Sequence, residues 1–232
     1  MTDLSVKTAY TDSQCTARQS KANALQETNR GSDSLEQLMP VLQQSFEKWA
    51  GRAMPDDVRQ RLMEIATVEH WEKDQQMIAL GELPEKLYFI CKGLCRSYYL
   101  DQNGNDVTRF FILEGDWCLT EIQILAEPSE LCVETLETCD FLVFRIADMA
   151  RFHDSDFLKD AYICALQSNI RHKIKRESGF LMCSATERYL DFQKRWPGLE
   201  RRITQSQLAS YLGITPTSLS RIRRALRKEP QE

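Results

Sequence analysis

Residues 203–226 constrain the fold of this chain more than any other segment, because they specify two short helices and the turn between them. Thr204 and Gln207 have the spacing of a capping box, in which each side chain accepts a hydrogen bond from the backbone N–H of the other residue. Gly213 can supply the positive φ angle of a tight turn, and Pro216 suits the first position of a second helix. This pattern predicts a helix-turn-helix. Its inward-facing residues are small or apolar: Leu208, Ala209, Leu212, Ile214, Leu219 and Ile222.

The outward side of the second helix carries residues suited to reading DNA. Short hydrogen-bonding residues come first and a basic run follows, which is the order in which a recognition helix reaches base edges and then phosphates. We expect Arg221 to bind the O6 and N7 of a guanine. The alternative is a basic amphipathic helix whose arginines are only a solvated face. The predicted base contacts are Thr217, Ser218, Ser220 and Arg221, and the predicted phosphate contacts are Thr204, Gln205, Arg223, Arg224, Arg227 and Lys228.

Positive charge is concentrated at the C-terminal end of the chain. Between residues 195 and 228 there are eight Lys and Arg and a single Glu, although the whole chain has a formal net charge of −4. The remainder of the chain is therefore strongly acidic. This asymmetry is typical of a nucleic-acid-binding module attached to an acidic partner domain, although basic tails also serve solubility alone.

The N-terminal two thirds of the chain divide by composition and periodicity. A length of 232 residues is enough for about two domains. Residues 1–34 are rich in small polar residues and are predicted to be a mobile tail. Residues 35–155 begin with two short amphipathic helices and continue, over about 68–144, with five short β-prone runs. The predicted strands are residues 87–91, 95–100, 107–113, 131–136 and 141–144. The clearest hairpin signal is Asn103-Gly104, because these residues readily adopt the positive φ angles of a tight turn.

A long helix is predicted at residues 156–182, followed by the DNA-binding domain at residues 183–232. Apolar residues in this helix recur about every 3.5 positions, which suits a coiled coil with a second copy of the chain. His172, Lys173 and Glu177 interrupt the stripe, so packing against the β-unit of the same chain is the alternative. The predicted dimer contacts are Ile163, Leu166, Ile170, Ile174 and Leu181.

The order of these segments, with EGDW in the β-unit and ITQSQLASYLGITPTSLSRIRRAL at residues 203–226, resembles the Crp/Fnr family of bacterial transcription regulators. The resemblance covers about residues 35–226. It implies an α+β fold with a cyclic-nucleotide-binding-like β-roll, a homodimer formed through the long helix, and a C-terminal domain that reads an inverted repeat. By the family pattern, Thr217, Ser220 and Arg221 occupy base-reading positions. We therefore expect double-stranded DNA, a second copy of the chain and RNA polymerase as partners.

The β-unit departs from the family pattern where cyclic nucleotides bind. The nucleotide-binding members hold the ligand phosphate with an arginine, whereas this region carries Glu130 and no arginine. Because a carboxylate repels a phosphate, we predict that cyclic AMP does not bind and that any small-molecule effector is of another kind. The predicted effector pocket consists of Trp117, Thr120, Glu121, Ser129 and Glu130.

Many members of the family continue into a β-hairpin wing after the second helix. The sequence ends six residues after Leu226, so we expect no wing at this position. Phosphate contacts must then come from Thr204, Gln205 and the basic run, with the helix N-termini contributing their dipoles.

The cysteines are predicted to be buried free thiols rather than a redox switch. The N-terminal tail offers only Cys15, which is too few for the Fnr-type iron–sulfur sensor. Cys91 and Cys95, taken to lie on one strand, would be about 13 Å apart and too distant for a disulfide. Pairing across strands stays open for three others: Cys118, Cys132 and Cys139.

No sequence motif points to an enzyme, a metal site or a membrane protein. There is no Gly-rich phosphate loop, no Gly-x-Ser-x-Gly and no His-Glu-x-x-His, and His70, His153 and His172 lack ligand spacing. We expect no cofactor. The longest apolar run has six residues and no signal peptide is evident, so we expect a cytoplasmic protein. The rival hypothesis is a ligand- or protein-binding protein whose helix-turn-helix contacts another protein.

Overall fold

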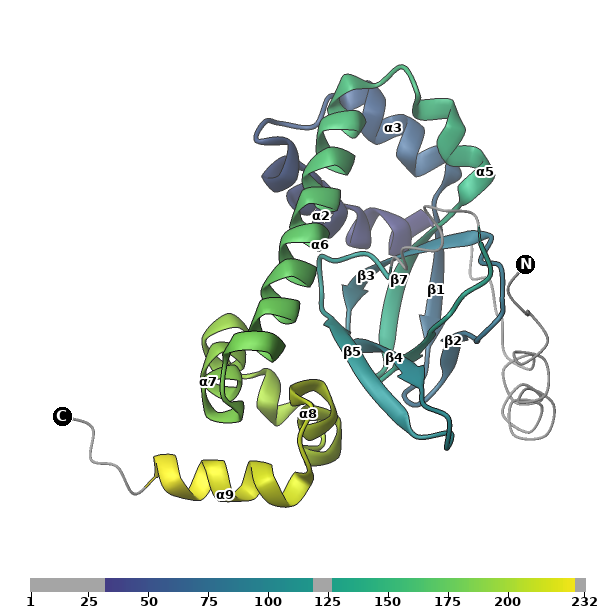
Figure 1. The fold of residues 1–232 in the computed structure, drawn as a ribbon. Helices are drawn as coiled ribbons and strands as arrows, with labels where there is room; N and C mark the ends of the chain where they lie inside the picture. Colours follow the sequence, from purple (N-terminus) through teal and green to yellow (C-terminus); the bar gives the residue numbers. More distant parts are fainter. Residues whose placement is uncertain (1–31, 119–126, 228–232) are drawn as a thin grey trace, which may run out of the picture.

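The computed structural model describes residues 32–118 and 127–227. They form a β-roll with helices packed at one end, and a long helix leads from there to the C-terminal helices (Figure 1). The expected α+β class, with a β-roll and a long helix, is confirmed. The elements in chain order are α2 (Ser32–Ala50), α3 (Asp56–Ile65), β1 (Thr67–Trp71), β2 (Gln76–Ile78), β3 (Lys86–Lys92), β4 (Cys95–Leu100), β5 (Asp106–Ile112), β6 (Cys132–Thr135), β7 (Cys139–Arg145), α5 (Ile146–Met149), η1 (Ala150–Phe152), α6 (Asp156–Met182), α7 (Ala185–Arg195), η2 (Leu199–Arg201), α8 (Gln205–Leu212) and α9 (Pro216–Leu226).

The roll consists of two antiparallel sheets, with strand orders β1-β7-β3 and β2-β6-β4-β5. The five predicted strands are present, each with bounds within two residues of the prediction. The β4–β5 hairpin turns at Gly104, which has a φ of 77°. The Asp101 carboxylate accepts hydrogen bonds from the backbone N–H groups of Asn103 and Asn105, both at 2.8 Å. The predicted Asn-Gly turn is therefore confirmed.

Two strands of the roll, β1 and β2, were not predicted from the sequence. In β1 a carboxylate, Glu69, occupies a buried position that normally takes an apolar residue. Lys86 donates to Glu69 at 2.7 Å, and the indole N–H of Trp71 donates to it at 3.0 Å. Burial of a charged residue is tolerated because both partners satisfy it, and no periodicity rule anticipates such a pairing.

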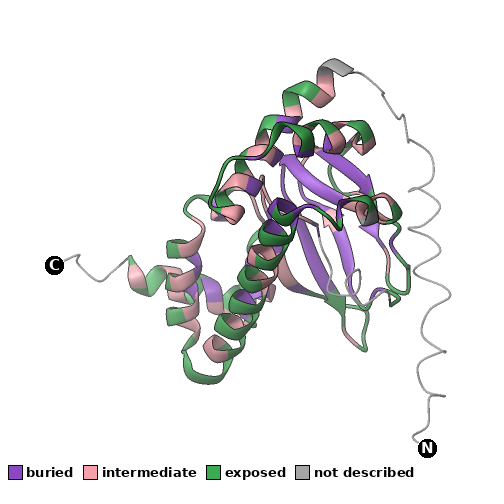
Figure 2. Ribbon diagram, turned by 90° about the horizontal axis from the view of Figure 1, so that it is seen from above, coloured by how far each residue is buried: buried purple, intermediate pink, exposed green. Residues whose placement is uncertain are grey.

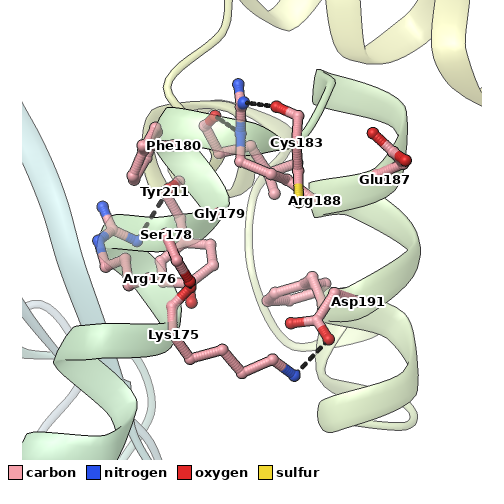
Figure 3. Close-up of a pocket in the computed structure, with 12 residues that line it drawn as sticks. Lys175, Arg176, Ser178, Gly179, Phe180, Cys183, Glu187, Arg188, Asp191 and Tyr211 are labelled. Carbon is pink, nitrogen blue, oxygen red and sulfur yellow. Dashed lines mark hydrogen bonds and ion pairs between the residues drawn. The ribbon is translucent and has the colours of Figure 1, made fainter.

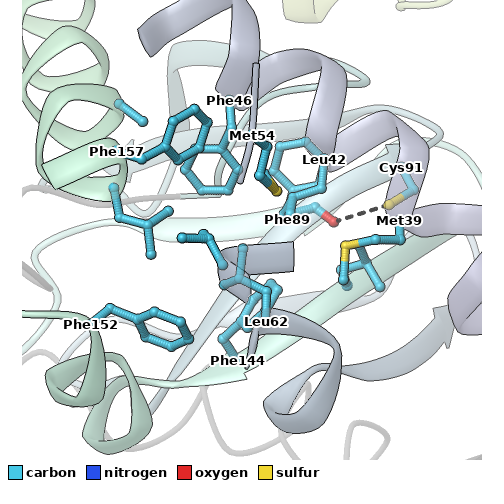
Figure 4. Packing of buried hydrophobic residues seen from close by; sticks show 14 residues of the cluster. Met39, Leu42, Phe46, Met54, Leu62, Phe89, Cys91, Phe144, Phe152 and Phe157 are labelled. Atoms are coloured by element: carbon cyan, nitrogen blue, oxygen red, sulfur yellow. Dashed lines mark hydrogen bonds between the residues drawn. The ribbon is translucent and has the colours of Figure 1, made fainter. Parts of the chain in front are cut away.

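The first helix begins earlier than expected. Residues 32–34 were predicted to belong to the tail but lie in α2, so the predicted tail boundary is wrong. The rest of the predicted tail, residues 1–31, lies outside the described residues. Helix α2 also contains Pro40. The helix forms because its inner side buries large apolar residues against the roll, which outweighs the cost of the proline. This core comprises Met39, Leu42, Phe46, Leu62, Phe89, Phe144 and Phe157, among others (Figure 4).

The cysteines differ in two respects from the prediction. Cys91 lies on β3 and Cys95 on β4, because the chain turns at Gly93 with a φ of 103°, so the assumption of a single strand is wrong. All seven cysteines within the described ranges are free thiols, but Cys183 is exposed and Cys164 is half-buried rather than buried.

Helix α6 has one buried and one exposed side. Its N-cap, Ser155, accepts a hydrogen bond from the backbone N–H of Leu158, and the first turns pack against α2. Figure 2 shows the outer side of the helix as exposed. Ile163, Ile170, Ile174 and Leu181 are 50%, 56%, 60% and 77% exposed, and Leu166 is half-buried. The predicted stripe therefore does not pack against the β-unit of its own chain.

The inner side of α6 carries His172, which lies where α6, β5 and α7 meet. The imidazole is 4.4 Å from the ring of Phe110 and 5.9 Å from that of Trp196, measured between ring centroids. The side chain is buried, and neither ring nitrogen has a hydrogen-bond partner. Burial, reinforced by the positive charges of Arg195 and Arg176, among others, lowers the pKa of His172 to about 3. The junction therefore holds this imidazole in its neutral form.

We predict that acid destabilises this junction through His172. A histidine in the unfolded chain titrates near pH 6.5 and this one near pH 3, so stability is fully present above pH 6.5 and falls between these values. The slope is about 1.4 kcal/mol per pH unit, or about 2 kcal/mol lost at pH 5. Urea unfolding at pH 7 and pH 5 measures this loss.

The variant His172→Phe keeps an aromatic ring against Phe110 and Trp196 but cannot take up a proton, so it should lose less stability between the two pH values. The matched control His153→Phe alters an exposed histidine and should behave like the wild type. Equal acid losses in His172→Phe and the wild type would refute the assignment.

Candidate nucleic-acid interface

Helix α8 begins with the predicted capping box. The backbone N–H of Gln207 donates to the Thr204 hydroxyl at 3.2 Å, and the backbone N–H of Thr204 donates to the Gln207 side chain at 2.9 Å. Each of these contacts satisfies a backbone donor that the first helical turn leaves unpaired. The local sequence therefore determines where α8 starts.

The turn between α8 and α9 depends on Gly213. Its φ of 68° is left-handed, and its backbone N–H bonds the carbonyl groups at the end of α8. A Cβ atom here would lie 2.6 Å from the ring of Phe180, so any other residue would have to displace this ring and would also strain the backbone. Helix α9 then starts at Pro216. Its N-cap is Thr215, whose hydroxyl accepts a hydrogen bond from the backbone N–H of Ser218 at 3.1 Å. The predicted caps and turn are confirmed.

The outward side of α9 is open to solvent. Thr217, Ser220 and Arg221 are exposed on its N-terminal half, and Arg224 and Arg227 are exposed farther along. Of the remaining predicted contacts, Thr204 and Gln205 are exposed, Ser218 and Arg223 are half-buried, and Lys228 lies outside the described residues. The structure thus brings the hydroxyl, amide and guanidinium groups to one surface, which we call the α9 surface.

Gln205 connects the two helices across this surface. Its side-chain amide donates to the hydroxyl of Ser220 at 2.6 Å and to the backbone carbonyl of Pro216 at 2.8 Å. Both contacts hold the start of α9 against the start of α8. The Gln205 amide therefore positions Ser220. Gln205 is also one of the predicted phosphate contacts.

Arg223 has a partner within the protein. Its guanidinium forms an ion pair with Glu200 and lies 5.9 Å from the ring centroid of Tyr189. Burial raises the pKa of Glu200, but hydrogen bonds from Gln193, Tyr189 and Arg223 together outweigh it and hold the pKa below its ordinary value. Arg223 therefore anchors α9 to Glu200 on η2, the short helix that precedes α8. Its phosphate contact stays a prediction.

Helix α8 also covers the edge strand β5 of the roll. The Ser210 hydroxyl accepts from the backbone N–H of Thr108 at 2.8 Å and donates to the carbonyl of Asp106 at 3.2 Å. Arg176 donates to the carbonyl groups of Thr108 at 3.1 Å and Tyr211 at 3.0 Å. An edge strand otherwise leaves such backbone groups without a protein partner. These bonds fix α8 relative to the roll.

Arg202, just before α8, is clamped between two carboxylates of the roll. It donates to Glu137 at 2.6 and 2.9 Å and to Glu114 at 2.6 and 3.1 Å. The sequence did not predict a role for Arg202, Arg176 or Ser210. No local signal could have found the clamp, because the partners of Arg202 are 65 and 88 positions away in the chain.

A hollow lies at the junction of α6 and α7 (Figure 3). The guanidinium of Arg176 lies 4.9 Å from the ring centroid of Phe180 and 4.4 Å from that of Tyr211. Lys175 forms an ion pair with Asp191 on α7. Because these cations already bind protein groups, we interpret the hollow as part of the joint between the long helix and α7.

A second hollow separates the start of α8 from the β4–β5 hairpin. Thr204 and Gln207 line one side, and Asn105 and Asp106 line the other. Asp106 forms an ion pair with the buried Arg96, which partly neutralises its charge. A carboxylate thus stands opposite a predicted phosphate contact.

Of the predicted effector residues, Trp117, Ser129 and Glu130 lie within the described ranges. Trp117 packs in the core, with its ring 5.2 Å from that of Phe89. The buried Ser129 hydroxyl donates to a backbone carbonyl at 2.7 Å, and Glu130 is exposed. Burial raises the pKa of the neighbouring Asp116 to about 6. Thr120 and Glu121 lie outside the described residues, so the predicted pocket stays a prediction.

Residues 68–156 match the family model of the cyclic nucleotide-binding domain. No curated protein matches the chain in sequence. The match agrees with the two-sheet roll described above, so this part of the chain is a domain of the cyclic nucleotide-binding type.

Solved structures with the same fold cover most of the chain. FixK2 from Bradyrhizobium japonicum is 20% identical with a TM-score of 0.60, over 70% of this chain and 85% of FixK2. CLP from Xanthomonas campestris is 11% identical with a TM-score of 0.61, over 77% of this chain and 96% of CLP. A CooA mutant from Carboxydothermus hydrogenoformans is 15% identical with a TM-score of 0.60, over 72% of this chain and 78% of CooA. At these identities the likeness establishes the fold.

Two further properties concern the described ranges alone. Within residues 32–118 and 127–227, no helix combines the length and the apolar character that a bilayer span requires. In the same ranges, no group of three or more His, Cys, Asp or Glu side chains is arranged to hold a metal ion.

We predict that Arg202→Ala loosens α8 from the roll. Loss of a two-sided clamp at a partly exposed site should cost about 1 kcal/mol, and amide exchange in α8 should become about fivefold faster. Hydrogen–deuterium exchange of residues 205–212 measures this. Arg201→Ala is the matched control, since Arg201 is an exposed neighbour. If both variants exchange alike, the clamp does not hold α8.

Proposed function

We propose that this protein is a DNA-binding transcription regulator in which α8 and α9 form the helix-turn-helix and α9 enters the major groove. The observation that carries the proposal is the joint exposure of Thr217, Ser220 and Arg221 on the N-terminal half of α9. A recognition helix uses these positions to reach base edges. The exposed Arg224 and Arg227 then suit the phosphates, which explains why the positive charge follows the base-reading residues.

The fold comparisons support a regulator of this kind. FixK2, CLP and CooA are Crp/Fnr-type regulators, and CLP is a c-di-GMP responsive global regulator that links cell–cell signalling to virulence gene expression. The proposal includes action in the cytoplasm and RNA polymerase as a further partner, as the sequence resemblance implies.

The proposed contacts with DNA are as follows. Ser218 contributes a fourth base contact, and Thr204 and Gln205 bind phosphate at the start of α8. Arg223 contacts a phosphate while it also pairs with Glu200. Lys228 is a further phosphate contact at the end of the basic run. In this division, the hydroxyl groups and Arg221 determine which base sequence is preferred. The other cations contribute affinity that depends on the salt concentration.

The protein acts as a homodimer on an inverted repeat. In this arrangement residues 35–155 form the effector-type domain, residues 156–182 the dimer helix and residues 183–232 the DNA-binding domain. The exposed stripe of α6, centred on Ile170 and Ile174, supports the dimer because a single chain leaves it in water.

In vitro selection from random duplexes, without added ligand and at near-physiological salt, tests the proposal. A dyad-symmetric motif with half-sites about one helical turn apart is expected. Failure to enrich any motif would contradict DNA recognition by the free protein. In that case, binding to a protein partner with little dependence on salt would favour the rival interaction function.

We predict that Arg221→Ala and Arg227→Ala have different effects on DNA binding. Arg221→Ala should cost about 1–3 kcal/mol at one base position of each half-site and relax the preference there. Arg227→Ala should weaken cognate and scrambled duplexes alike and reduce the salt slope by about 1. Fluorescence anisotropy at several salt concentrations measures both effects, and indistinguishable variants would refute the division of roles.

We predict that Ile174→Glu abolishes the dimer, because a charged residue then occupies the centre of the apolar stripe. Sedimentation velocity should show a monomer for this variant and a dimer for the wild type. Leu83→Glu is the matched control, because Leu83 is 56% exposed in the β2–β3 loop and Ile174 is 60% exposed. A dimer that survives Ile174→Glu would place the interface elsewhere.

We predict that cyclic AMP does not bind the roll. The exposed Glu130 lies in the region where the nucleotide-binding members supply an arginine, and its charge repels a phosphate. Isothermal titration with cyclic AMP up to millimolar concentration should show no saturable heat. A clean one-site isotherm would contradict this.

A further inference from the structure

Three thiols and a thioether meet inside the β-roll. The Sγ atom of Cys95 on β4 lies 3.9 Å from the Sγ atom of Cys139 on β7. The Sδ atom of Met77 lies 3.8 Å from the same Cys95 sulfur, and the Cys118 thiol also interacts with it. All four side chains are buried. Cys95 is therefore the centre of a sulfur cluster that the proposed function does not use.

Cys95 and Cys139 belong to different sheets of the roll. β4 lies in the four-stranded sheet and β7 in the three-stranded sheet (Figure 1). The two residues are 44 positions apart in the chain. A disulfide between them would therefore join the two sheets covalently across the interior of the roll.

The sulfur atoms of this pair are in contact but not at bonding distance. A disulfide requires about 2.05 Å between the sulfurs, so they must approach by about 2 Å. Cys91 and Cys132 have other neighbours: Cys91 donates to the carbonyl of Leu38, and Cys132 accepts from a glutamine side chain. Cys118 also interacts with the Cys95 thiol. The contact of 3.9 Å between the Cys95 and Cys139 sulfurs is the one that would join the two sheets.

The two thiols also differ in acidity. The hydrogen bond from Cys95 lowers the pKa of Cys139, whereas burial raises the pKa of Cys95 well above its ordinary value. An oxidant reacts with the thiolate rather than the thiol. The contact between the two sulfurs lets either thiol react first, and the lower pKa of Cys139 favours Cys139 as the thiol that attacks the oxidant.

We propose that Cys95 and Cys139 are a dithiol that hydrogen peroxide converts reversibly into a disulfide between the two sheets. The Cys139 thiolate attacks one peroxide oxygen, the O–O bond breaks, and a sulfenic acid and one molecule of water form with uptake of a proton. The Cys95 sulfur then attacks the sulfenic sulfur, the S–O bond breaks, and the Cys95 proton leaves with the hydroxyl as a second water. Two thiols are oxidised by two electrons, and the peroxide is reduced.

The bond would form beside the clamp that holds α8. The thiol of Cys139 contacts the backbone carbonyl of Glu137 at 3.2 Å, and the carboxylate of Glu137 binds Arg202. Oxidation removes the proton through which Cys139 donates to this carbonyl. The redox state of the dithiol therefore acts on the turn that positions the C-terminal helices.

Peroxide treatment followed by peptide mapping tests the proposal. The full-length chain with Cys15→Ser and Cys183→Ser, which replace the tail thiol and the exposed thiol, keeps six cysteines. After peroxide, unfolding and alkylation, it should lose two alkylatable thiols and about 2 Da, and a dithiol reductant should restore both. Cleavage after Lys, Arg and Glu separates Cys118, Cys132 and Cys139, so a link from residues 93–96 to residues 138–145 identifies the pair.

Matched variants make the result specific. Cys139→Ser and Cys95→Ser should each abolish the link, whereas Cys132→Ser, which removes another buried thiol, should retain it. The oxidised protein should also unfold at a higher temperature, because the bond constrains the unfolded chain. Absence of any thiol loss, or a link that joins other cysteines, would overturn the proposal. The peptide map of the parent chain alone decides the question if a variant fails to fold.

Discussion

The position of the C-terminal helices depends on one apolar core that they share with the β-roll. Leu94 and Phe111 of the roll lie in the same buried cluster as Phe192, Leu208 and Leu212. Each large apolar side chain buried in this way contributes about 1.5–3 kcal/mol, more than a typical hydrogen bond. The helix pair is therefore fixed on the roll first by packing. The bonds from Ser210, Arg176 and Arg202 then set its orientation, because they are directional.

This arrangement gives the long helix α6 two different roles. Its inner side contacts the roll and the C-terminal helices through His172 and Arg176. Its outer side leaves Ile170 and Ile174 in water, as a second copy of the chain would require. The same helix thus connects a domain of the cyclic nucleotide-binding type with the α9 surface, for which we propose DNA binding.

Much of the candidate interface could be predicted, whereas part of the roll could not. The capping box at Thr204 and the turn at Gly213 match the prediction, because both follow from backbone groups a few residues apart. Strand β1 was missed because its inward residue, Glu69, is charged and depends on Lys86 of another strand. Of the proposed phosphate contacts, Arg223 carries an ion pair to Glu200 that helical periodicity does not reveal.

The sequence by itself determined where helices α8 and α9 begin and where the β4–β5 hairpin turns. Caps, turn glycines and the Asn103-Gly104 hairpin act over three or four residues, and their geometry is the same in any fold. Only the tertiary structure decided which distant groups meet: Arg202 with the carboxylates of the roll, Ser210 with the edge of β5, and Cys95 with Cys139. The physical reason is that these contacts join residues far apart in the chain, so their spacing in the sequence carries no information, and the packing of the sheets and helices brings them together.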